Sequence, residues 1–471
     1  MSIQTLFAAP IITSISPYFG PSSGGTVVSI TGSGFTGATD VSFGNIPAIF
    51  IVNSDTSITA TSPAHSPEVI SVIITAPSGT SAATPNSYFV YQGTWQLFVG
   101  NRTNNSVSII DTSTNSVVTT LPVGNTPTCV QITPDGTQAY VASVTNNTVS
   151  VINRATNTVT ATIPLPGALR PVGLAITPDG TKVYVTNINS GNVSVISTAT
   201  NTVITTIPIG VPVQGLAITP DGSKVYVSDS GGSTTSVIST ATNTVIATIP
   251  VGISPICAIT EDGTKVYVAN DIDGTVSVID IATDTVIATI PVGASPEAMA
   301  ITPNGNKVYV ANKDSNSVSV IDTITESVIA TIGVGNSPSG VAIKPDGTRA
   351  YVVNIPSVTV IDTSTDTFVA GIPLPGIPQM ISLTPDGAFA YVANFSGFVN
   401  VIDTATNTLL TTITTASGTQ SENMMADPAP LARFTYIANL AGSPTTFDAS
   451  QSISPVGTIV NYFGILVMDP R

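Results

Sequence analysis

Hydrophobic and polar residues alternate along most of the chain in short runs, separated by clusters of Gly, Asn, Asp and Pro. The stretch over residues 298–334, AMAITPNGNKVYVANKDSNSVSVIDTITESVIATIGV, contains four such runs. A period of two predicts half-buried β-strands, and Asn-Gly or Asp-Gly between two runs predicts a tight turn. We therefore expect four antiparallel strands here, named a to d in chain order.

The same four-strand pattern recurs along the chain. The turn residue between strands a and b returns every 40 to 44 positions, at Asp135, Asp179, Asp221, Asp262, Asn304, Asp346 and Asp386. The aromatic residue of strand b extends the series to nine copies, at Phe98, Tyr140, Tyr184, Tyr226, Tyr267, Tyr309, Tyr351, Tyr391 and Tyr436. Four-stranded units in tandem at this period indicate a β-propeller, with strand a innermost in each blade.

Strand b carries a short motif that points to a known group of repeats. It reads YVTN at 184–187 and YVAN at 267–270, 309–312 and 391–394. These repeats resemble the YVTN family of propeller repeats over residues 95–471. The resemblance implies the propeller fold and says little about function.

The first and last copies bear on how the ring closes. Residues 95–123 supply only strands b, c and d, and GILVMDP (464–470) resembles the strand a of another copy, GLAITPD (215–221). We expect 464–470 to close the first blade as a velcro strand and remove its free edge. The length of 95–471 favours nine blades. Eight is the alternative, because the last copy is degenerate and propellers have typically four to eight blades.

A different pattern occupies the N-terminal part of the chain. After a tail over 1–9, residues 10–91 form short alternating runs outside the propeller period, which predicts a small β-sandwich. The segments ITSISPYFGPSSGGTVVSITGSGF, VSFG, SITATSPA and YFVY resemble the IPT/TIG family of immunoglobulin-like domains. The resemblance implies a spacer or a part of a surface or binding protein.

Charge excludes several partners. The chain has only 12 Lys and Arg among 471 residues, no basic cluster, and a net charge of −15. Binding to nucleic acid or an anionic membrane needs a positive surface, so we expect neither. No apolar run is long enough to span a bilayer, and the start, MSIQTLFAAP, has no basic n-region of a cleaved signal peptide.

The sequence offers little catalytic chemistry. Its one histidine, His65, lies in the sandwich, so His-dependent nucleophilic or zinc chemistry is excluded from the propeller. Cys129 and Cys257 fall in different repeats and are interpreted as core residues. The repeated turn Asp and the lysine row (Lys182, Lys224, Lys265, Lys307, with Arg349) are interpreted as structural, each lysine within reach of a turn Asp. We expect no catalytic residues and no cofactor.

Candidate binding residues lie where the copies differ. Ligands of propellers usually meet the face formed by the d–a and b–c loops, the mouth. The d–a loops are mostly small and neutral, and the exceptions we take as binding candidates are Arg170, Gln214, Glu297 and Gln379. The b–c loop NDIDGT places Asp271 and Asp273 in a D-x-D-G pattern. It is read as a polar hairpin tip, with a weak Ca²⁺ site as the alternative, since the 12-residue EF-hand loop is absent.

These observations favour a non-catalytic structural or binding protein. We expect it at the cell or particle surface or outside the cell, exported without an evident cleaved signal peptide. Its partner would be a protein, a glycan or further copies of itself, met through the propeller loops and the sandwich. The alternative is a propeller lyase or hydrolase with a carboxylate-bound divalent metal in the mouth.

Overall fold

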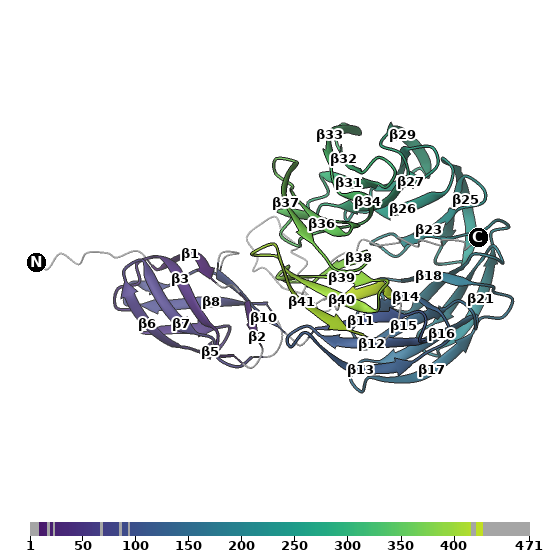
Figure 1. Ribbon diagram of the computed structural model, residues 1–471. Helices are drawn as coiled ribbons and strands as arrows, with labels where there is room; N and C mark the ends of the chain where they lie inside the picture. Colours follow the sequence, from purple (N-terminus) through teal and green to yellow (C-terminus); the bar gives the residue numbers. More distant parts are fainter. Residues whose placement is uncertain are drawn as a thin grey trace, which may run out of the picture. The chain divides into compact units, whose positions relative to one another are not determined.

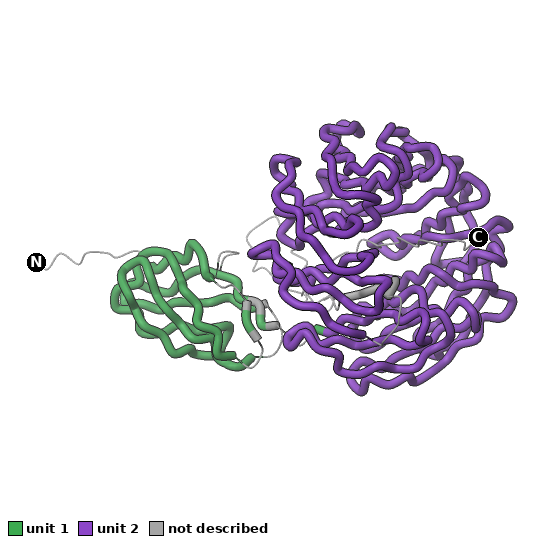
Figure 2. The backbone as a smooth tube through the Cα atoms, in the orientation of Figure 1, with its two compact units in different colours: residues 1–95, 429–431 green, residues 96–428, 432–471 purple. Residues whose placement is uncertain are grey.

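The computed structural model describes residues 9–16, 19–21, 24–65, 69–83, 87–92, 95–415 and 421–426. Its regular elements are β-strands, joined by turns into two compact units (Figures 1 and 2). One unit covers residues 1–95, and the other begins at Gln96. Within the described ranges no helix has the length and apolarity to cross a membrane.

The N-terminal unit is a two-sheet sandwich. One sheet has the order β1 (Ile11–Ser16), β3 (Val27–Ser33), β7 (Ser57–Thr61) and β6 (Ile49–Ser54). The other has the order β2 (Phe19–Pro21), β10 (Tyr88–Gln92), β8 (Val69–Ala76), β4 (Asp40–Phe43) and β5 (Ile46–Pro47), with β9 (Gly79–Thr80) paired to β8. Val28 and Ile30 of the first sheet share a core with Phe43, Val72 and Phe89 of the second. The expected immunoglobulin-like sandwich is confirmed.

The second unit is a β-propeller of eight four-stranded antiparallel sheets (Figure 1). Blade 1 consists of β42 (Ser421–Ala426), β11 (Gln96–Asn101), β12 (Ser106–Asp111) and β13 (Ser116–Pro122). Blade 2 consists of β14 (Pro127–Ile132), β15 (Gln138–Ser143), β16 (Thr148–Asn153) and β17 (Thr158–Pro164). Blade 3 consists of β18 (Pro171–Ile176), β19 (Lys182–Asn187), β20 (Asn192–Ser197) and β21 (Thr202–Pro208). Blade 4 consists of β22 (Leu216–Ile218), β23 (Lys224–Asp229), β24 (Thr234–Ser239) and β25 (Thr244–Pro250). Blade 5 consists of β26 (Pro255–Ile259), β27 (Lys265–Asn270), β28 (Thr275–Asp280) and β29 (Thr285–Pro291). Blade 6 consists of β30 (Pro296–Ile301), β31 (Lys307–Asn312), β32 (Ser317–Asp322) and β33 (Ser327–Gly333). Blade 7 consists of β34 (Asn336–Ile343), β35 (Arg349–Ile355), β36 (Ser357–Asp362) and β37 (Thr367–Pro373). Blade 8 consists of β38 (Pro378–Leu383), β39 (Phe389–Asn394), β40 (Phe398–Asp403) and β41 (Thr408–Thr414).

The described residues close the ring with eight blades, the alternative count, and not with the favoured nine. Each innermost strand contacts the innermost strands of both neighbouring blades, and β42 lies between β38 and β14 in this series. β42 pairs antiparallel with β11, so that Leu97 lies opposite Ala426 and Val99 opposite Met424. A C-terminal velcro strand is present, but its residues are 421–426. The expected segment 464–470 and the ninth aromatic, Tyr436, lie outside the described residues.

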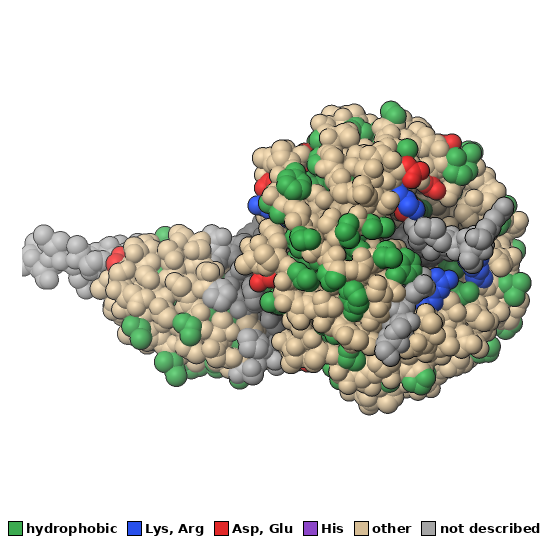
Figure 3. Space-filling view, viewed as in Figure 1, with side chains coloured by type: hydrophobic (Ala, Val, Ile, Leu, Met, Phe, Trp, Pro, Cys, Tyr) green, Lys and Arg blue, Asp and Glu red, His purple; other side chains and the backbone are tan. Residues whose placement is uncertain are grey.

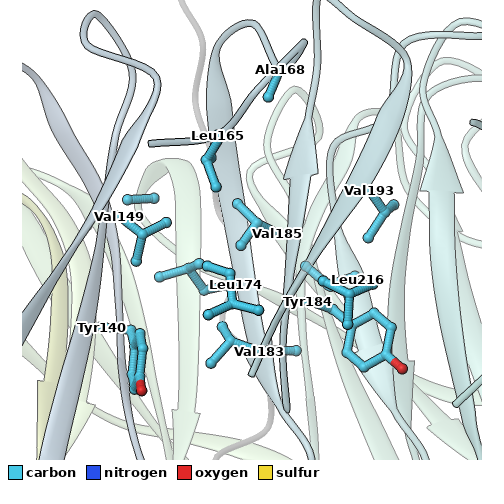
Figure 4. Close-up of a cluster of buried hydrophobic side chains, with 14 of the residues drawn as sticks. Tyr140, Val149, Leu165, Ala168, Leu174, Val183, Tyr184, Val185, Val193 and Leu216 are labelled. Atoms are coloured by element: carbon cyan, nitrogen blue, oxygen red, sulfur yellow. The ribbon is translucent and has the colours of Figure 1, made fainter. Parts of the chain in front are cut away.

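Blades pack face to face, which explains their hydrophobic pattern. Strands b and c are covered on both sides and are buried along nearly their whole length, as in β19. The outer strand d alternates between exposed and half-buried positions, as in β21. The core is therefore divided into seams between blades. Figure 4 shows the seams around blade 3, where Tyr140 and Val149 of blade 2 lie in one cluster with Leu174 and Val183 of blade 3.

Candidate functional site

The propeller has two rims with different chemistry. On the mouth rim the d–a and b–c loops are joined by hydrogen bonds, such as Val144 N to Thr126 O at 3.0 Å. On the opposite rim, called the turn rim, the a–b and c–d turns are joined in the same way, as Arg154 N donates to Thr137 O at 3.0 Å. Each group of residues from the sequence can thus be placed on one rim.

The repeated tyrosine of strand b joins neighbouring blades at the turn rim. In blades 2 to 8 its hydroxyl donates to a side-chain oxygen in the c–d turn of the next blade. The pairs and their O···O distances are Tyr140–Asn201 2.6 Å, Tyr184–Asn243 2.6 Å, Tyr226–Asp284 2.5 Å, Tyr267–Glu326 3.0 Å, Tyr309–Asp366 2.5 Å, Tyr351–Asn407 2.8 Å and Tyr391–Asn115 2.6 Å. The tyrosines are buried, and this burial raises the pKa of Tyr140 to about 12.

The lysine row of strand b reaches the same turns, which corrects an expectation from the sequence. Lys224 Nζ lies 2.8 Å from Asp284 Oδ2 and also donates to the Ile281 carbonyl. Lys265 pairs with Glu326 and Lys307 with Asp366 in the same way. These lysines therefore pair with the next blade and not with the a–b turn Asp of their own blade. Three seams each gain a small, partly exposed ion pair in this way.

The a–b turn carboxylates are used locally instead. Asp179 accepts hydrogen bonds from Thr177 Oγ1 at 2.5 Å and from Thr181 N at 3.0 Å. Burial acts to raise the pKa of Asp179, but these hydrogen bonds hold it below its ordinary value. Asn304 makes the same contacts with Thr302 Oγ1 and Asn306 N. An amide does the same work as a carboxylate here, so the recurring Asp is a turn residue.

One seam lacks the tyrosine bond. Blade 1 has Phe98 in place of tyrosine, and the c–d turn residue that faces this seam is Asn157. Among the described atoms, Asn157 Oδ1 is buried with no hydrogen-bond partner. The Arg154 guanidinium lies over the Phe98 ring at 5.8 Å from its centroid. A cation–π contact thus stands where the other seams have a hydroxyl.

Three of the four mouth candidates are held mainly through their backbones. Arg170 has a left-handed φ of 63°, and its N–H donates to Asn147 Oδ1 at 2.8 Å. The Gln214 carbonyl accepts from Thr186 Oγ1 at 2.7 Å, and the Gln379 carbonyl accepts from Ser339 Oγ at 3.0 Å. These candidates belong to blades 3, 4 and 8. Their backbone contacts tie neighbouring blades or loops together.

Glu297 has the richest charged surroundings of the four. Lys313 Nζ lies 2.5 Å from Glu297 Oε1, while Glu297 Oε2 is buried with no partner among the described residues. Burial raises the pKa of Glu297; Lys313 opposes this shift, and Asp271 and Asp314 add to it. Asp271 of blade 5 also accepts a hydrogen bond from Ser295 Oγ of blade 6 at 2.5 Å. We call Asp271, Ser295, Glu297, Lys313 and Asp314 the mouth cluster.

The two residues of the proposed calcium loop serve different neighbours. Asp271 contacts Ser295 of the next blade, whereas Asp273 Oδ2 accepts from Ile253 N of its own blade at 2.8 Å. Over the described ranges, no three or more His, Cys, Asp or Glu side chains are grouped so as to hold a metal ion. Both carboxylates are therefore used within the loops.

Sequence reasoning missed one buried acid, Asp229, at the end of β23. Only 1% of its surface is exposed, and Oδ2 accepts hydrogen bonds from Thr234 Oγ1 at 2.6 Å and Ser236 Oγ at 2.9 Å. Most blades have an amide here; Asn270, for example, donates Nδ2 to Thr275 and Ser277. Burial raises the pKa of Asp229. The signal in the sequence was Asp229 at a position where six of the other seven described copies have Asn.

The remaining reactive side chains are two buried cysteines and one half-buried histidine. Cys129 and Cys257 are both buried, and burial raises the pKa of Cys257 to about 11. A thiol with a raised pKa is a poor nucleophile. The His65 ring stacks on Tyr91 with centroids 4.9 Å apart, inside the sandwich unit.

Comparison with known families agrees with this architecture. Residues 10–91 match the IPT/TIG domain, and residues 71–174 and 256–349 match the YNCE-like β-propeller. The chain thus carries an N-terminal immunoglobulin-like domain and a β-propeller, a combination that fits a binding or structural role. No curated protein matches the chain.

Solved structures of other proteins share the propeller. Hydrazine synthase of Kuenenia stuttgartiensis aligns with 26% identity and a TM-score of 0.50, over 59% of this chain and 96% of its own. The dihydro-heme d1 dehydrogenase NirN in complex with DHE aligns with 16% identity and a TM-score of 0.61, over 70% and 74%. A functionally unknown protein from Desulfotomaculum acetoxidans DSM 771 aligns with 16% identity and a TM-score of 0.52, over 71% and 99%. The last two show the fold alone.

Proposed function

We propose that this chain is a non-catalytic binding protein, displayed at a cell or particle surface, whose propeller holds a partner at the mouth rim. The mouth cluster is the contact that anchors the partner, and the immunoglobulin-like domain serves as spacer or second contact. The observation that carries this proposal is that only one oxygen of the Glu297 carboxylate has a partner among the described residues. One oxygen pairs with Lys313, and the other is buried without a partner among the described residues.

The rest of the mouth rim supports a localised site. Its d–a loops are mostly small and uncharged, and the face of the molecule in Figure 3 carries few charged side chains. A partner that offers an N–H or O–H donor to the exposed Asp314 and an acceptor to Lys313 would be recognised by paired polar contacts at one seam. Protein backbone and glycan hydroxyls both have this chemistry. The partner is therefore a protein or a glycan.

Three features support binding over catalysis. The propeller has no histidine, its two thiols are buried, and the recurring carboxylates serve turns and seams. The likeness to hydrazine synthase covers 59% of this chain at 26% identity. A likeness of this extent does not give this chain the activity of that enzyme.

The test compares matched charge variants of the full chain. Binding to a glycan array and to extracts of the source's surface proteins is measured for Glu297→Gln and Lys313→Gln. Glu261→Gln and Lys344→Gln, on the turn rim, are the controls. We expect the mouth variants to lose at least ten-fold in affinity and the controls to bind normally. Equal binding by all four variants would overturn the mouth site, and absence of the protein from the surface fraction of intact cells would overturn the display role.

A further inference from the structure

The outermost strands of the propeller carry no charge. These eight strands, β13, β17, β21, β25, β29, β33, β37 and β41, form the outer wall. Their sequences are SVVTTLP, TVTATIP, TVITTIP, TVIATIP, TVIATIP, SVIATIG, TFVAGIP and TLLTTIT, with no Asp, Glu, Lys, Arg or His. Edge strands are usually protected from pairing with other chains, often by charged side chains. Here the protection must come from something else.

That protection is a β-bulge in every outer strand. In blade 4, Val237 pairs with Ala247 and Ile238 with Val245, which leaves Ile246 unpaired. The third residue of the outer strand is passed over in the same way in all eight blades. A bulge bends the strand and interrupts its ladder, so it hinders the addition of another strand along this edge. The wall can therefore make contacts through side chains more readily than through strand addition.

The bulge residue is a half-exposed apolar side chain in seven of the eight blades. The exposed fractions are Val118 51%, Ile204 51%, Ile246 51%, Ile287 51%, Ile329 48%, Val369 41% and Leu410 50%. Blade 2 has Thr160 at this position. The sixth residue is buried in every outer strand except β13, as Ile249 at 4% and Ile290 at 3% illustrate. The outer wall therefore exposes an apolar side chain to solvent at the same strand position in seven blades.

In two pairs of neighbouring blades the second residue of the outer strand is an exposed apolar side chain as well. In blades 4 and 5, Val245 at 37% and Val286 at 36% join Ile246 and Ile287, and strands β25 and β29 contact each other. These four residues form the first wall patch. In blades 7 and 8, Phe368 at 58% and Leu409 at 36% join Val369 and Leu410 on the contacting strands β37 and β41. These four form the second wall patch. Grouped exposed apolar side chains of this kind mark an interaction surface.

The distribution of charge over the propeller indicates which partner contacts the two wall patches. The chain has a net charge of −15, and the turn rim carries the recurring a–b and c–d carboxylates. Two copies that approach by their turn rims bring like charges together, whereas two outer walls meet with no charge on either strand. We propose that the wall patches are the contact between copies of this chain, packed wall to wall. Because each ring has two patches, each copy can take two neighbours and extend an array.

The contact is separate from the mouth cluster, so the two proposals fail independently. The test is the mass of the purified full chain over a concentration series, by sedimentation velocity at neutral pH. We expect the wild type to associate as concentration rises, and more strongly at high salt. Ile246→Lys/Ile287→Lys and Phe368→Lys/Leu410→Lys should each weaken association at least ten-fold, and together should give a monomer.

The matched control is Thr160→Lys, at the same bulge position of blade 2, where the wild type has no apolar side chain. It should associate like the wild type. Circular dichroism and melting curves of all variants should match the wild type, because the substituted positions are exposed. A wild type that stays monomeric throughout would overturn the proposal. So would association that survives both wall double substitutions in folded protein but is lost in Lys313→Gln.

Discussion

Tyr391 in the last blade donates its hydroxyl hydrogen to Asn115 Oδ1 in the first blade, at 2.6 Å and across 276 positions of sequence. The bond is the same in kind as those at six other seams. In addition to the β42–β11 pairing, it fastens the last blade to the first. The ring closure therefore has a side-chain bond whose loss can be measured.

We expect Tyr391→Phe to lower the free energy of unfolding by about 1 kcal/mol, because it removes one hydrogen bond and leaves Asn115 Oδ1 without that partner. Urea denaturation followed by fluorescence measures the change. Tyr351→Phe, which breaks the corresponding bond to Asn407, should cost a similar amount. No change in either variant would contradict a stabilising role for these bonds.

The reverse substitution is available at the seam between blades 1 and 2. Phe98→Tyr places a hydroxyl where Asn157 Oδ1 is buried without a partner among the described atoms. We expect a gain of about 1 kcal/mol in the free energy of unfolding. Tyr140→Phe, at the next seam, should change it in the opposite direction. A destabilised Phe98→Tyr protein would mean that Arg154 already occupies the space the hydroxyl needs.

Asp229→Asn should stabilise the protein at neutral pH by about 1 kcal/mol, since the folded state holds this acid above its ordinary pKa. Below the unfolded pKa the wild-type acid is protonated in both states, and its contribution to stability is complete. That contribution is lost as the pH rises through the folded pKa. The gain from Asn should therefore shrink as the pH falls toward 4. Unfolding free energies of both proteins between pH 3 and 8 check the sign; a constant difference would contradict it.

Asp179→Asn should change the free energy of unfolding by less than about 0.5 kcal/mol at neutral pH, because Asn304 makes the same turn contacts. The pKa of Asp179 is lowered on folding, so its contribution is present above the unfolded pKa and disappears as the pH falls through the folded value. The variant should lack this acid-dependent loss. Melting curves at several pH values measure it, and a large loss at neutral pH would contradict the turn role.

Calcium should leave the protein unchanged, because Asp271 and Asp273 are engaged by separate donors of the protein. A ligand that binds only the folded state raises the melting temperature with its concentration. We expect no such rise when Ca²⁺ is added to chelator-treated protein. A rise that Asp273→Asn abolishes would contradict the expectation and restore the calcium loop.

Local features of the fold were readable from the sequence, whereas long-range partners were not. The strands, the a–b turn and the sandwich follow from alternation and turn residues that lie within one repeat. Blade number depends on which distant segment pairs with β11. The segment that does so, β42, reads SENMMA and has no clear alternation. In the repeat pattern β42 is the strand a with which a ninth copy begins. It pairs with β11 and so completes the first blade instead of starting a ninth.

The partners of the lysine row illustrate the same limit. Lys224 and Asp284 are 60 positions apart, more than one repeat, so spacing within a repeat cannot pair them. A comparison of each lysine with the turn one blade further on would have found the acids at Asp284, Glu326 and Asp366. At the mouth, Glu297 was found as an outlier among neutral loops. Its partner Lys313 and the nearby like charge of Asp271 could not be read from the spacing within one repeat.

The recurring tyrosine bond has a consequence for chain connectivity. The junction between blades 8 and 1 uses the same tyrosine-to-turn bond as six of the seven junctions within the chain. A circular permutant that joins β42 to the start of β11 and opens at another d–a loop would therefore keep every one of these bonds. The order in which the blades are synthesised is not required by the ring they form.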